Sequence, residues 1–202
     1  MTVIIDYGVG NLFSLKSSFA AIGEVAIISS DENEIRNADR IILPGVGAFE
    51  DAAKKLKSSG LDKVVRDIAK EGKPLMGICL GMQMLFDKSF EYGEHDGLSL
   101  IKGNVRALSD ILPKELKIPH IGWNALYFKG EKHPLFKYIN EGDCVYFVHS
   151  YYGADCDCVS AVCEYDKEIT AAVCKGNVMG CQFHPEKSGD VGLAILKSFC
   201  EM

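Results

Sequence analysis

The chain has 202 residues, of which 48 % are hydrophobic and 25 % are charged, and its formal net charge is −6. Acidic and basic residues are interspersed, which argues against a nucleic acid or an anionic membrane surface as a partner. No apolar run approaches the roughly 20 residues that span a bilayer, and no signal peptide is expected at the N-terminus. The eight cysteines are therefore expected to be reduced thiols in a cytoplasmic protein.

Apolar runs alternate with segments of helical periodicity through the first half of the chain. Such β-branched runs without polar interruption are typical of strands that are buried on both faces of a parallel sheet. Strands are expected at residues 2–6, 24–29, within 38–47 and at 74–79. Helices are expected at residues 12–22, 49–58 and 61–69, and a further helix begins at residue 80. This alternation predicts a doubly wound α/β fold.

The second half has a different character, because short strand-like runs follow one another with turn residues between them. These runs lie at residues 104–109, 124–129, 144–154, 159–165 and 169–185, and residues 191–202 form an amphipathic helical segment. They predict a meander that extends or covers the sheet. No linker or internal repeat divides the chain. A single α/β domain over residues 1–202 is therefore expected, with a mostly parallel sheet and a strand-rich C-terminal half.

Cys79 lies between Gly77 and Gly81, at the point where a predicted strand runs into a predicted helix. This spacing is the sulfur analogue of the Gly-x-Ser-x-Gly nucleophile elbow, in which a sharp turn exposes the nucleophile. The start of the helix favours the thiolate and aims the backbone N–H of Leu80 at a developing oxyanion. Taken alone, the pattern fits a buried strand cysteine equally well.

His184 and Glu186 lie in the segment Cys-Gln-Phe-His-Pro-Glu near the C-terminus. The proline after His184 favours an extended backbone and ends the strand. A thiolate nucleophile needs a base, and Glu186 is close enough in sequence to orient the imidazole. Cys79, His184 and Glu186 are therefore predicted to form a catalytic triad.

Residues 44–47, with the sequence Pro-Gly-Val-Gly, follow the third predicted strand. In a parallel sheet, ligands collect at the carboxyl ends of the strands, where this loop and Cys79 both lie. The backbone amides of Gly45 and Val46 are candidates to complete an oxyanion hole, and a simple tight turn is the alternative.

These three segments, in this order, resemble the class I, triad-type glutamine amidotransferase family over nearly the whole chain. The resemblance implies a flavodoxin-like fold and hydrolysis of L-glutamine to L-glutamate and ammonia, and no cofactor or metal is expected. It implies a γ-glutamyl thioester on Cys79, with His184 as acid and base and Glu186 orienting the ring. The glutamine-binding positions that it implies are Gly47, Gln83, Glu91, Ser150 and Tyr151.

Three other segments, Ile4–Ser18, Pro119–Asn124 and Tyr146–Tyr152, are similar to one branch of that family, the glutaminase subunits of imidazole glycerol phosphate synthase. This similarity implies a heterodimer with a (β/α)8-barrel cyclase subunit of the HisF type, which uses the ammonia in L-histidine biosynthesis. Positions that match the interface with the cyclase are Asn11, Trp123, Tyr146 and Lys187. Without the partner, the oxyanion hole around residues 45–46 is expected to be poorly formed.

Three other functions fit parts of the sequence. A class I amidotransferase subunit for a different ammonia acceptor keeps the same chemistry but leaves the branch-specific segments unexplained. A cysteine-dependent hydrolase or peptidase of a related fold accounts for Cys79 and His184 only. A non-enzymatic metal-binding module would draw on Cys144, His149, Cys156, Cys158 and Cys163, whose spacing lacks the usual pair of Cys-x2–4-Cys motifs.

Overall fold

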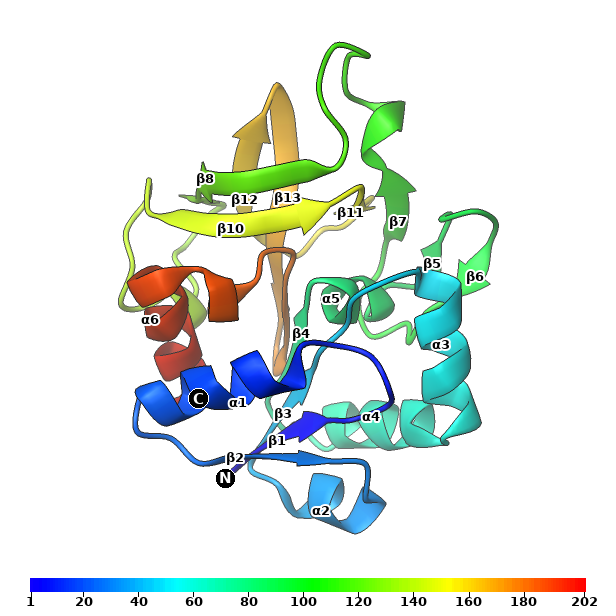
Figure 1. The fold of residues 1–202 in the computed structure, drawn as a ribbon, viewed down its shortest axis with the longest axis vertical. Coiled ribbons are helices and arrows are strands. Elements are labelled where there is room, and N and C mark those ends of the chain that lie inside the picture. Colours follow the sequence, from blue (N-terminus) through cyan, green and yellow to red (C-terminus); the bar gives the residue numbers. More distant parts are fainter.

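An eight-stranded sheet runs through the middle of the computed structural model, which describes all 202 residues (Figure 1). Across the sheet the strands are β2 (Ala26–Ser29), β1 (Thr2–Ile5), β3 (Arg40–Leu43), β4 (Leu75–Ile78), β14 (Val178–Cys181), β13 (Lys167–Lys175), β12 (Val159–Tyr165) and β9 (Tyr127–Phe128). Neighbours are parallel from β2 through β14 and antiparallel from there to β9. The α/β fold with a doubly wound, largely parallel sheet is confirmed.

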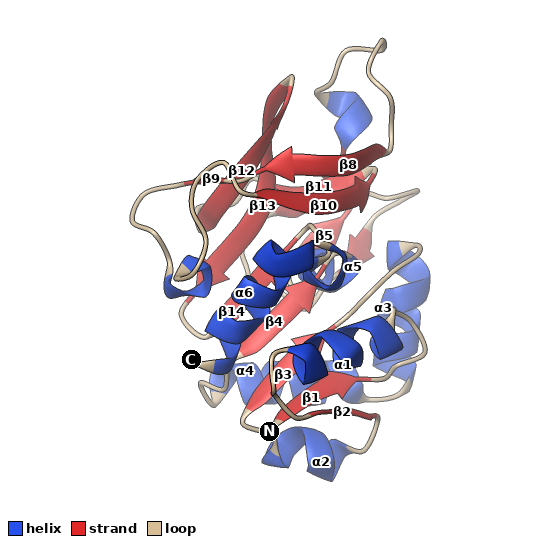
Figure 2. Cartoon of the chain, turned by 60° about the vertical axis from the view of Figure 1, so that its left-hand side comes forward, coloured by secondary structure: helices blue, strands red, loops and turns tan.

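Helices cover both faces of this sheet, because its parallel strands are apolar on both sides. Ile4 of β1 packs into the same core as helices α1 (Leu12–Ala21) and α6 (Gly189–Cys200), which Figure 2 shows on the near side. Val3 and Ile5 point the other way, into the core beneath the remaining helices. Those helices are α2 (Glu32–Asn37), α3 (Phe49–Ser58), α4 (Leu61–Lys70) and α5 (Leu80–Met84). No helix combines the length and apolar character that a membrane crossing requires.

Two smaller sheets stand at the end of the main sheet where β4 stops (Figure 1). One pairs β8 (His120–Ala125) with β10 (Cys144–His149) in antiparallel fashion. The other has the order β11 (Tyr151–Ala154), β7 (Asn104–Ala107), β5 (Lys88–Ser89) and β6 (His95–Asp96). Together they form a cover over the carboxyl ends of the parallel strands, which is where the predicted site lies.

The predicted elements of the first half are present, and the second half differs in detail. The expected strand over residues 144–154 is two strands that meet at Ser150, since the chain leaves β8 as its partner and pairs with β7 instead. The expected strand over residues 124–129 is likewise divided between β8 and β9. Helix α2 was not predicted, although Asp31 caps it by accepting bonds from the N–H groups of Asn33 and Glu34.

Candidate active site

Cys79 sits at the sharp turn between β4 and α5, with φ 55° and ψ −112°. This backbone conformation is rare for any residue with a side chain, and its strain is typical of a nucleophile elbow. The two flanking glycines are required by the same turn. A Cβ on Gly77 would lie 2.5 Å from the carbonyl oxygen of Gly81, and one on Gly81 would lie 1.9 Å from that of Leu43. The spacing Gly-x-Cys-x-Gly is therefore what the turn can accommodate.

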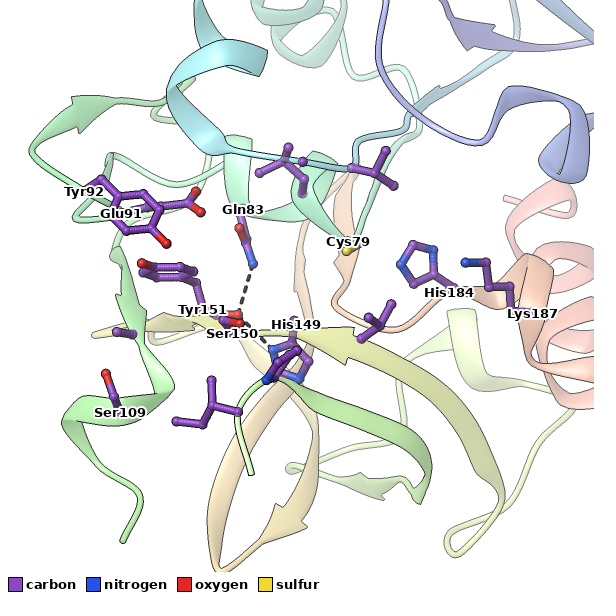
Figure 3. Close-up of a pocket in the computed structure, with 17 residues that line it drawn as sticks. Cys79, Gln83, Glu91, Tyr92, Ser109, His149, Ser150, Tyr151, His184 and Lys187 are labelled. Carbon is purple, nitrogen blue, oxygen red and sulfur yellow. Dashed lines mark hydrogen bonds between the residues drawn. The ribbon is translucent and has the colours of Figure 1, made fainter. Parts of the chain in front are cut away.

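His184 lies beside the Cys79 sulfur, as Figure 3 shows. It lies three residues after the end of β14 and caps the short 3-10 helix Pro185–Lys187, whose turn brings Glu186 back toward the ring. The Nδ1 atom of His184 donates to Oε1 of Glu186 at 2.8 Å, and both side chains are almost completely buried. The structure thus brings Cys79, His184 and Glu186 together in the order that the sequence predicted.

The pKa of His184 is set by two opposing effects. Burial lowers it, but hydrogen bonds and charge interactions with Cys79 and Glu186 outweigh burial and raise the pKa to about 9. The imidazole therefore carries a proton on both nitrogens at neutral pH. A protonated ring beside the sulfur is suited to stabilise a thiolate and to supply a proton to a leaving group.

Two buried glutamines extend this arrangement, and sequence reasoning singled out only one of them. Nε2 of Gln182 donates to the Cys79 sulfur at 3.7 Å, and Oε1 of Gln182 accepts from Nε2 of Gln83 at 3.0 Å. The same Nε2 of Gln83 also donates to the carbonyl oxygen of Tyr151 at 3.1 Å. Gln182 stands two residues before His184 in the Cys-Gln-Phe-His-Pro-Glu segment, so its place in that motif was the available signal.

One of the predicted oxyanion donors is already engaged in this conformation. The backbone N–H of Leu80, expected to face an oxyanion, donates instead to the carbonyl oxygen of Gly45 at 3.3 Å. The loop is held there by a second bond, in which the Tyr7 hydroxyl donates to the carbonyl oxygen of Pro44 at 2.7 Å. Gly45 is buried, whereas Val46 is exposed. The carbonyl of Gly45 thus occupies the Leu80 donor, which agrees with the expectation of a poorly formed oxyanion hole in the chain alone, and the role of Leu80 in the reaction stays a prediction.

A cavity of about 530 Å³ opens beside the triad. Its walls include Cys79 and His184 together with every position predicted to bind the substrate, namely Gly47, Gln83, Glu91, Ser150 and Tyr151. Glu91 has a specific place in it, because its Oε2 accepts from the backbone N–H of Phe49, the first residue of α3, at 2.7 Å. The start of α3 thus holds the carboxyl group of Glu91 in place on the cavity wall.

His149 also lines the cavity, but its hydrogen bonds assign it a structural place. Its Nδ1 lies 2.8 Å from the carbonyl oxygen of Tyr151, which can only accept, so Nδ1 donates. Its Nε2 then accepts from Nδ1 of His120, at 3.0 Å. Burial lowers the pKa of His149 to about 4. Both histidines are therefore neutral, and they brace the turn at Ser150 rather than offering a second base.

Three of the four predicted interface residues form one surface cluster. Trp123 is 57 % exposed, and its ring meets that of Tyr146 edge to face with 6.1 Å between centroids. Nζ of Lys187 lies 5.9 Å from the Tyr146 ring, and Lys187 reaches the rim of the cavity. Asn11 does not share these contacts, since its side chain caps α1 by accepting from the N–H of Ser14.

The residues of the metal-binding alternative are not gathered at one point. Cys163 is buried in the main core, Cys144 is exposed at the start of β10, and His149 is occupied by Tyr151 and His120. Of that set, only the loop residues Cys156 and Cys158 lie together, with Asp157 between them. All eight cysteines are free thiols.

The chain matches a family model described as glutamine amidotransferase class-I over residues 3–201. Similar curated proteins carry the name imidazole glycerol phosphate synthase subunit HisH. One from Caldanaerobacter subterraneus subsp. tengcongensis is 52 % identical, with 100 % of this chain and 98 % of the relative covered. Another, from Sulfurimonas denitrificans, is 46 % identical, with 98 % and 97 % covered. A third, from Bacillus cereus strain AH187, is 48 % identical, with 98 % and 93 % covered.

Solved structures share the fold at low sequence identity. The structure of PurLQS from Thermotoga maritima superposes with a TM-score of 0.77 at 20 % identity, covering 99 % of this chain and 97 % of the other. A crystal structure described as a glutamine amidotransferase gives 0.75 at 19 % identity, with 98 % of each chain covered. At these identities the likeness bears on the fold alone.

Proposed function

Because this chain belongs to the class I glutamine amidotransferase family, we propose that it is the glutaminase subunit of an imidazole glycerol phosphate synthase. In this role it hydrolyses L-glutamine to L-glutamate and ammonia in the cytoplasm. The ammonia passes to a (β/α)8-barrel cyclase subunit, which makes imidazole glycerol phosphate and aminoimidazole carboxamide ribotide for L-histidine biosynthesis. Near full-length similarity to three proteins named as this subunit supports the assignment.

The observation that carries the catalytic part of the proposal is the Cys79–His184–Glu186 arrangement at one end of the cavity. The Cys79 thiolate attacks the γ-carboxamide carbon of glutamine, and the carbonyl electrons move to oxygen. As this intermediate collapses, the C–N bond breaks and protonated His184 gives its proton to the departing nitrogen. Water then attacks the thioester, with His184 taking a proton and Glu186 keeping the ring oriented.

Glutamine is a zwitterion, and the cavity offers a partner for its ammonium group. Glu91 supplies a carboxylate at the far wall, where one oxygen is already held by the start of α3. The peptide around Ser150 and Tyr151, braced by His149, lines the same cavity and suits the substrate carboxylate. The Nε2 atom of Gln83 is engaged in hydrogen bonds within the protein. Gln83 therefore acts as a residue that positions the substrate close to Cys79. Gly47, with φ 96°, lets the loop pass close to the substrate without a side chain.

The oxyanion loop, residues 44–47, is the part of the site that a partner must rearrange before glutamine is hydrolysed efficiently. With the carbonyl of Gly45 on the Leu80 N–H, a tetrahedral intermediate lacks its donors, and losing one such donor typically costs about 10²–10³-fold in turnover. Docking of the cyclase and binding of its nucleotide would reorient the peptide between residues 45 and 46 and free these donors. Hydrolysis is then coupled to the presence of an acceptor, so ammonia is not released into solution.

The surface around Trp123, Tyr146 and Lys187 is the proposed docking face. Trp123 is a large exposed aromatic residue next to the cavity rim, and such residues are typical anchors of protein interfaces. Asn11 caps α1, and Ser14 of that helix lies near the 3-10 helix that contains Glu186. A barrel seated on this face would cover the mouth of the cavity and receive ammonia directly.

The test measures glutamate release by the chain alone, with the cyclase, and with the cyclase and its nucleotide substrate. We expect turnover to rise by about 10²-fold or more in the full complex, the size of a restored oxyanion donor. Equal turnover in all three mixtures would reject the proposed coupling. Glutaminase activity that responds to a different synthase, and not to this cyclase, would instead identify an amidotransferase with another ammonia acceptor.

A further inference from the structure

Two thiols outside the cavity lie unusually close together. Cys156 and Cys158 belong to the loop between β11 and β12, and their sulfurs are 3.2 Å apart. Residues two apart in an extended strand are separated by about 6.6 Å along the chain, so this loop is folded so as to bring the sulfurs together. The backbone N–H of Cys158 also points at the Cys156 sulfur, at 3.4 Å.

The loop is anchored on both sides of the pair. Before it, Oδ2 of Asp155 accepts from the side chains of Asn104 and Arg106 on β7, at 3.1 and 3.4 Å. After it, the carbonyl oxygen of Cys158 accepts from the backbone N–H of Cys174 on β13, at 3.0 Å. The separation of the sulfurs is therefore maintained by neighbouring strands and is not a chance approach of two free side chains.

These two thiols differ from the buried cysteines in being accessible to solvent, and from Cys144 in having a second thiol nearby. Cys163, Cys181 and Cys200 are buried, Cys174 is half-buried, and burial raises the pKa of all four, so they react slowly with thiol reagents. Cys144 is exposed but has no neighbouring thiol. Cys156 and Cys158 are half-buried, so small reagents reach them, and each has a second sulfur in range.

Hydrogen bonding gives the two sulfurs different roles. The bond from Cys158 and the backbone N–H at Cys158 lower the pKa of Cys156 to about 7. The pKa of Cys158 is raised, first by its contact with the Cys156 sulfur, then by burial and by the negative charge that a Cys156 thiolate brings. Because only Cys156 also accepts from a backbone N–H, its thiolate is the better stabilised of the two and is the attacking group, and a thiol whose pKa lies near the ambient pH is the fastest in exchange.

We propose that Cys156 and Cys158 form a thiol–disulfide exchange site, which closes a reversible intramolecular disulfide on reaction with a low-molecular-weight disulfide. The Cys156 thiolate attacks one sulfur of the reagent, forms a mixed disulfide and releases the first reagent thiolate. Once Cys156 is no longer an anion, Cys158 loses its proton, attacks the Cys156 sulfur and releases the second. The two protein thiols are oxidised, the reagent disulfide is reduced to two thiols, and the protons of the protein thiols end on these products.

This site is independent of the glutaminase chemistry, because neither cysteine lines the cavity. It is nonetheless connected to it through the chain, since β11 begins at Tyr151, which does line the cavity. Asp157 places a carboxylate within reach of both sulfurs, so a thiophilic cation would compete for the pair. A chelator in the reaction removes that competitor.

The experiment treats the full-length protein, with a chelator present, with mixtures of oxidised and reduced glutathione and follows intact mass and cysteine peptides. We expect the protein to lose two hydrogen atoms, the loss to map to the peptide that contains residues 156–158, and dithiothreitol to reverse it. Cys158→Ser should stop at a glutathione adduct on Cys156. Cys156→Ser should form no intramolecular disulfide and should react several-fold more slowly. Cys144→Ser is the matched control and should close the disulfide at the wild-type rate.

The proposal is overturned if residues 156–158 stay reduced in mixtures that modify Cys144 or Cys79. It is also overturned if Cys158→Ser accumulates no adduct on Cys156, because the attacking thiol would then be assigned wrongly. Mapping every cysteine separates these outcomes from modification of the catalytic thiol. The result does not depend on a cyclase or on glutamine turnover, so it stands or falls apart from the proposed function.

Discussion

Two parts of the catalytic centre differ in how far they are arranged for the reaction. They are the triad of Cys79, His184 and Glu186, called the triad side, and the oxyanion loop of residues 44–47, called the loop side. On one side, Cys79, His184 and Glu186 are aligned, and the His184–Glu186 bond is already short at 2.8 Å. On the other side, the Leu80 N–H is bonded to the carbonyl oxygen of Gly45 at 3.3 Å, so the oxyanion hole is closed. The nucleophile and its base are prepared for reaction, whereas the group that must stabilise the transition state is not.

The difference follows from what holds each side. The triad rests on the ends of β4 and β14, which are adjacent parallel strands in the middle of the main sheet. The oxyanion loop is held by single hydrogen bonds, from Leu80 to Gly45 and from Tyr7 to Pro44. One such bond is worth only about 0.5–1.5 kcal/mol net, and binding of a partner readily supplies that much. Control of the activity is therefore expected on the loop side and not on the triad side.

Removing the nucleophile gives the largest effect. Cys79→Ala should lower glutamine hydrolysis by at least about 10⁴-fold, because the thioester cannot form. Synthesis by the complex from added ammonia should be unchanged, since the cyclase does not use this thiol. Ammonia release measured with and without cyclase checks the prediction. Retained hydrolysis in the variant would mean that another group is the nucleophile.

Removing the orienting carboxylate should cost less. Glu186→Ala leaves His184 in place but free to turn, and the loss should be roughly 10²-fold smaller than for Cys79→Ala. The matched control is Glu201→Ala, which removes a carboxylate at the C-terminus that pairs with Lys137 and Tyr138. Equal losses in Cys79→Ala and Glu186→Ala would show that Glu186 does more than orient the ring.

The triad side could be predicted from sequence because its determinants are local. The glycines around Cys79 are forced by contacts within one turn, and the proline after His184 ends its strand. The strands of the first half could be predicted equally well, since an apolar run that is buried on both faces fits few structures other than a strand of a parallel sheet. Where a strand changes its partner, as at Ser150, the pattern of apolar residues continues and the break is not visible.

The loop side could not be predicted in the same way. Whether the carbonyl of Gly45 points in or out is a matter of peptide orientation, which no residue pattern encodes. The bonds of Gln182 to Cys79 and of His120 to His149 join residues that are 103 and 29 positions apart. The first pair depends on the register of β14 against β4 and the second on the register of β8 against β10, and the sequence pattern fixes neither register.

Loosening the loop should raise the partner-free activity by a modest factor. Tyr7→Phe removes the hydroxyl that donates to the carbonyl oxygen of Pro44, which weakens the closed state by about 0.5–1.5 kcal/mol. Glutaminase turnover without the cyclase should rise about two- to tenfold, and turnover in the full complex should stay near wild type. Tyr165→Phe is the control, since it removes a tyrosine hydroxyl that donates to the backbone carbonyl of Lys117 and not to residues 44–47. Unchanged partner-free turnover would place the restraint elsewhere.

The smallest predicted effect is on the thermal stability of the protein, to which the charged imidazole of His184 contributes. The pKa of His184 is raised from 6.5 to about 9, so the charged imidazole stabilises the fold fully below pH 6.5. This contribution is lost as the pH rises through about 9, where the folded protein gives up the proton. The Tm advantage of wild type over His184→Gln should therefore shrink by about a few degrees across this interval.

His133 provides the control for this stability measurement, because burial lowers its pKa instead of raising it. Its titration affects stability only at pH values below its ordinary pKa. The difference in Tm between wild type and His133→Gln should therefore stay constant above pH 6.5. Thermal scans of both variants at matched pH values distinguish the two cases. A wild-type advantage that stays constant for His184→Gln would mean that the ring is neutral in the folded protein. The proton for the leaving nitrogen would then have to come from the Cys79 thiol as it attacks, and the triad side would be less prepared than its geometry indicates.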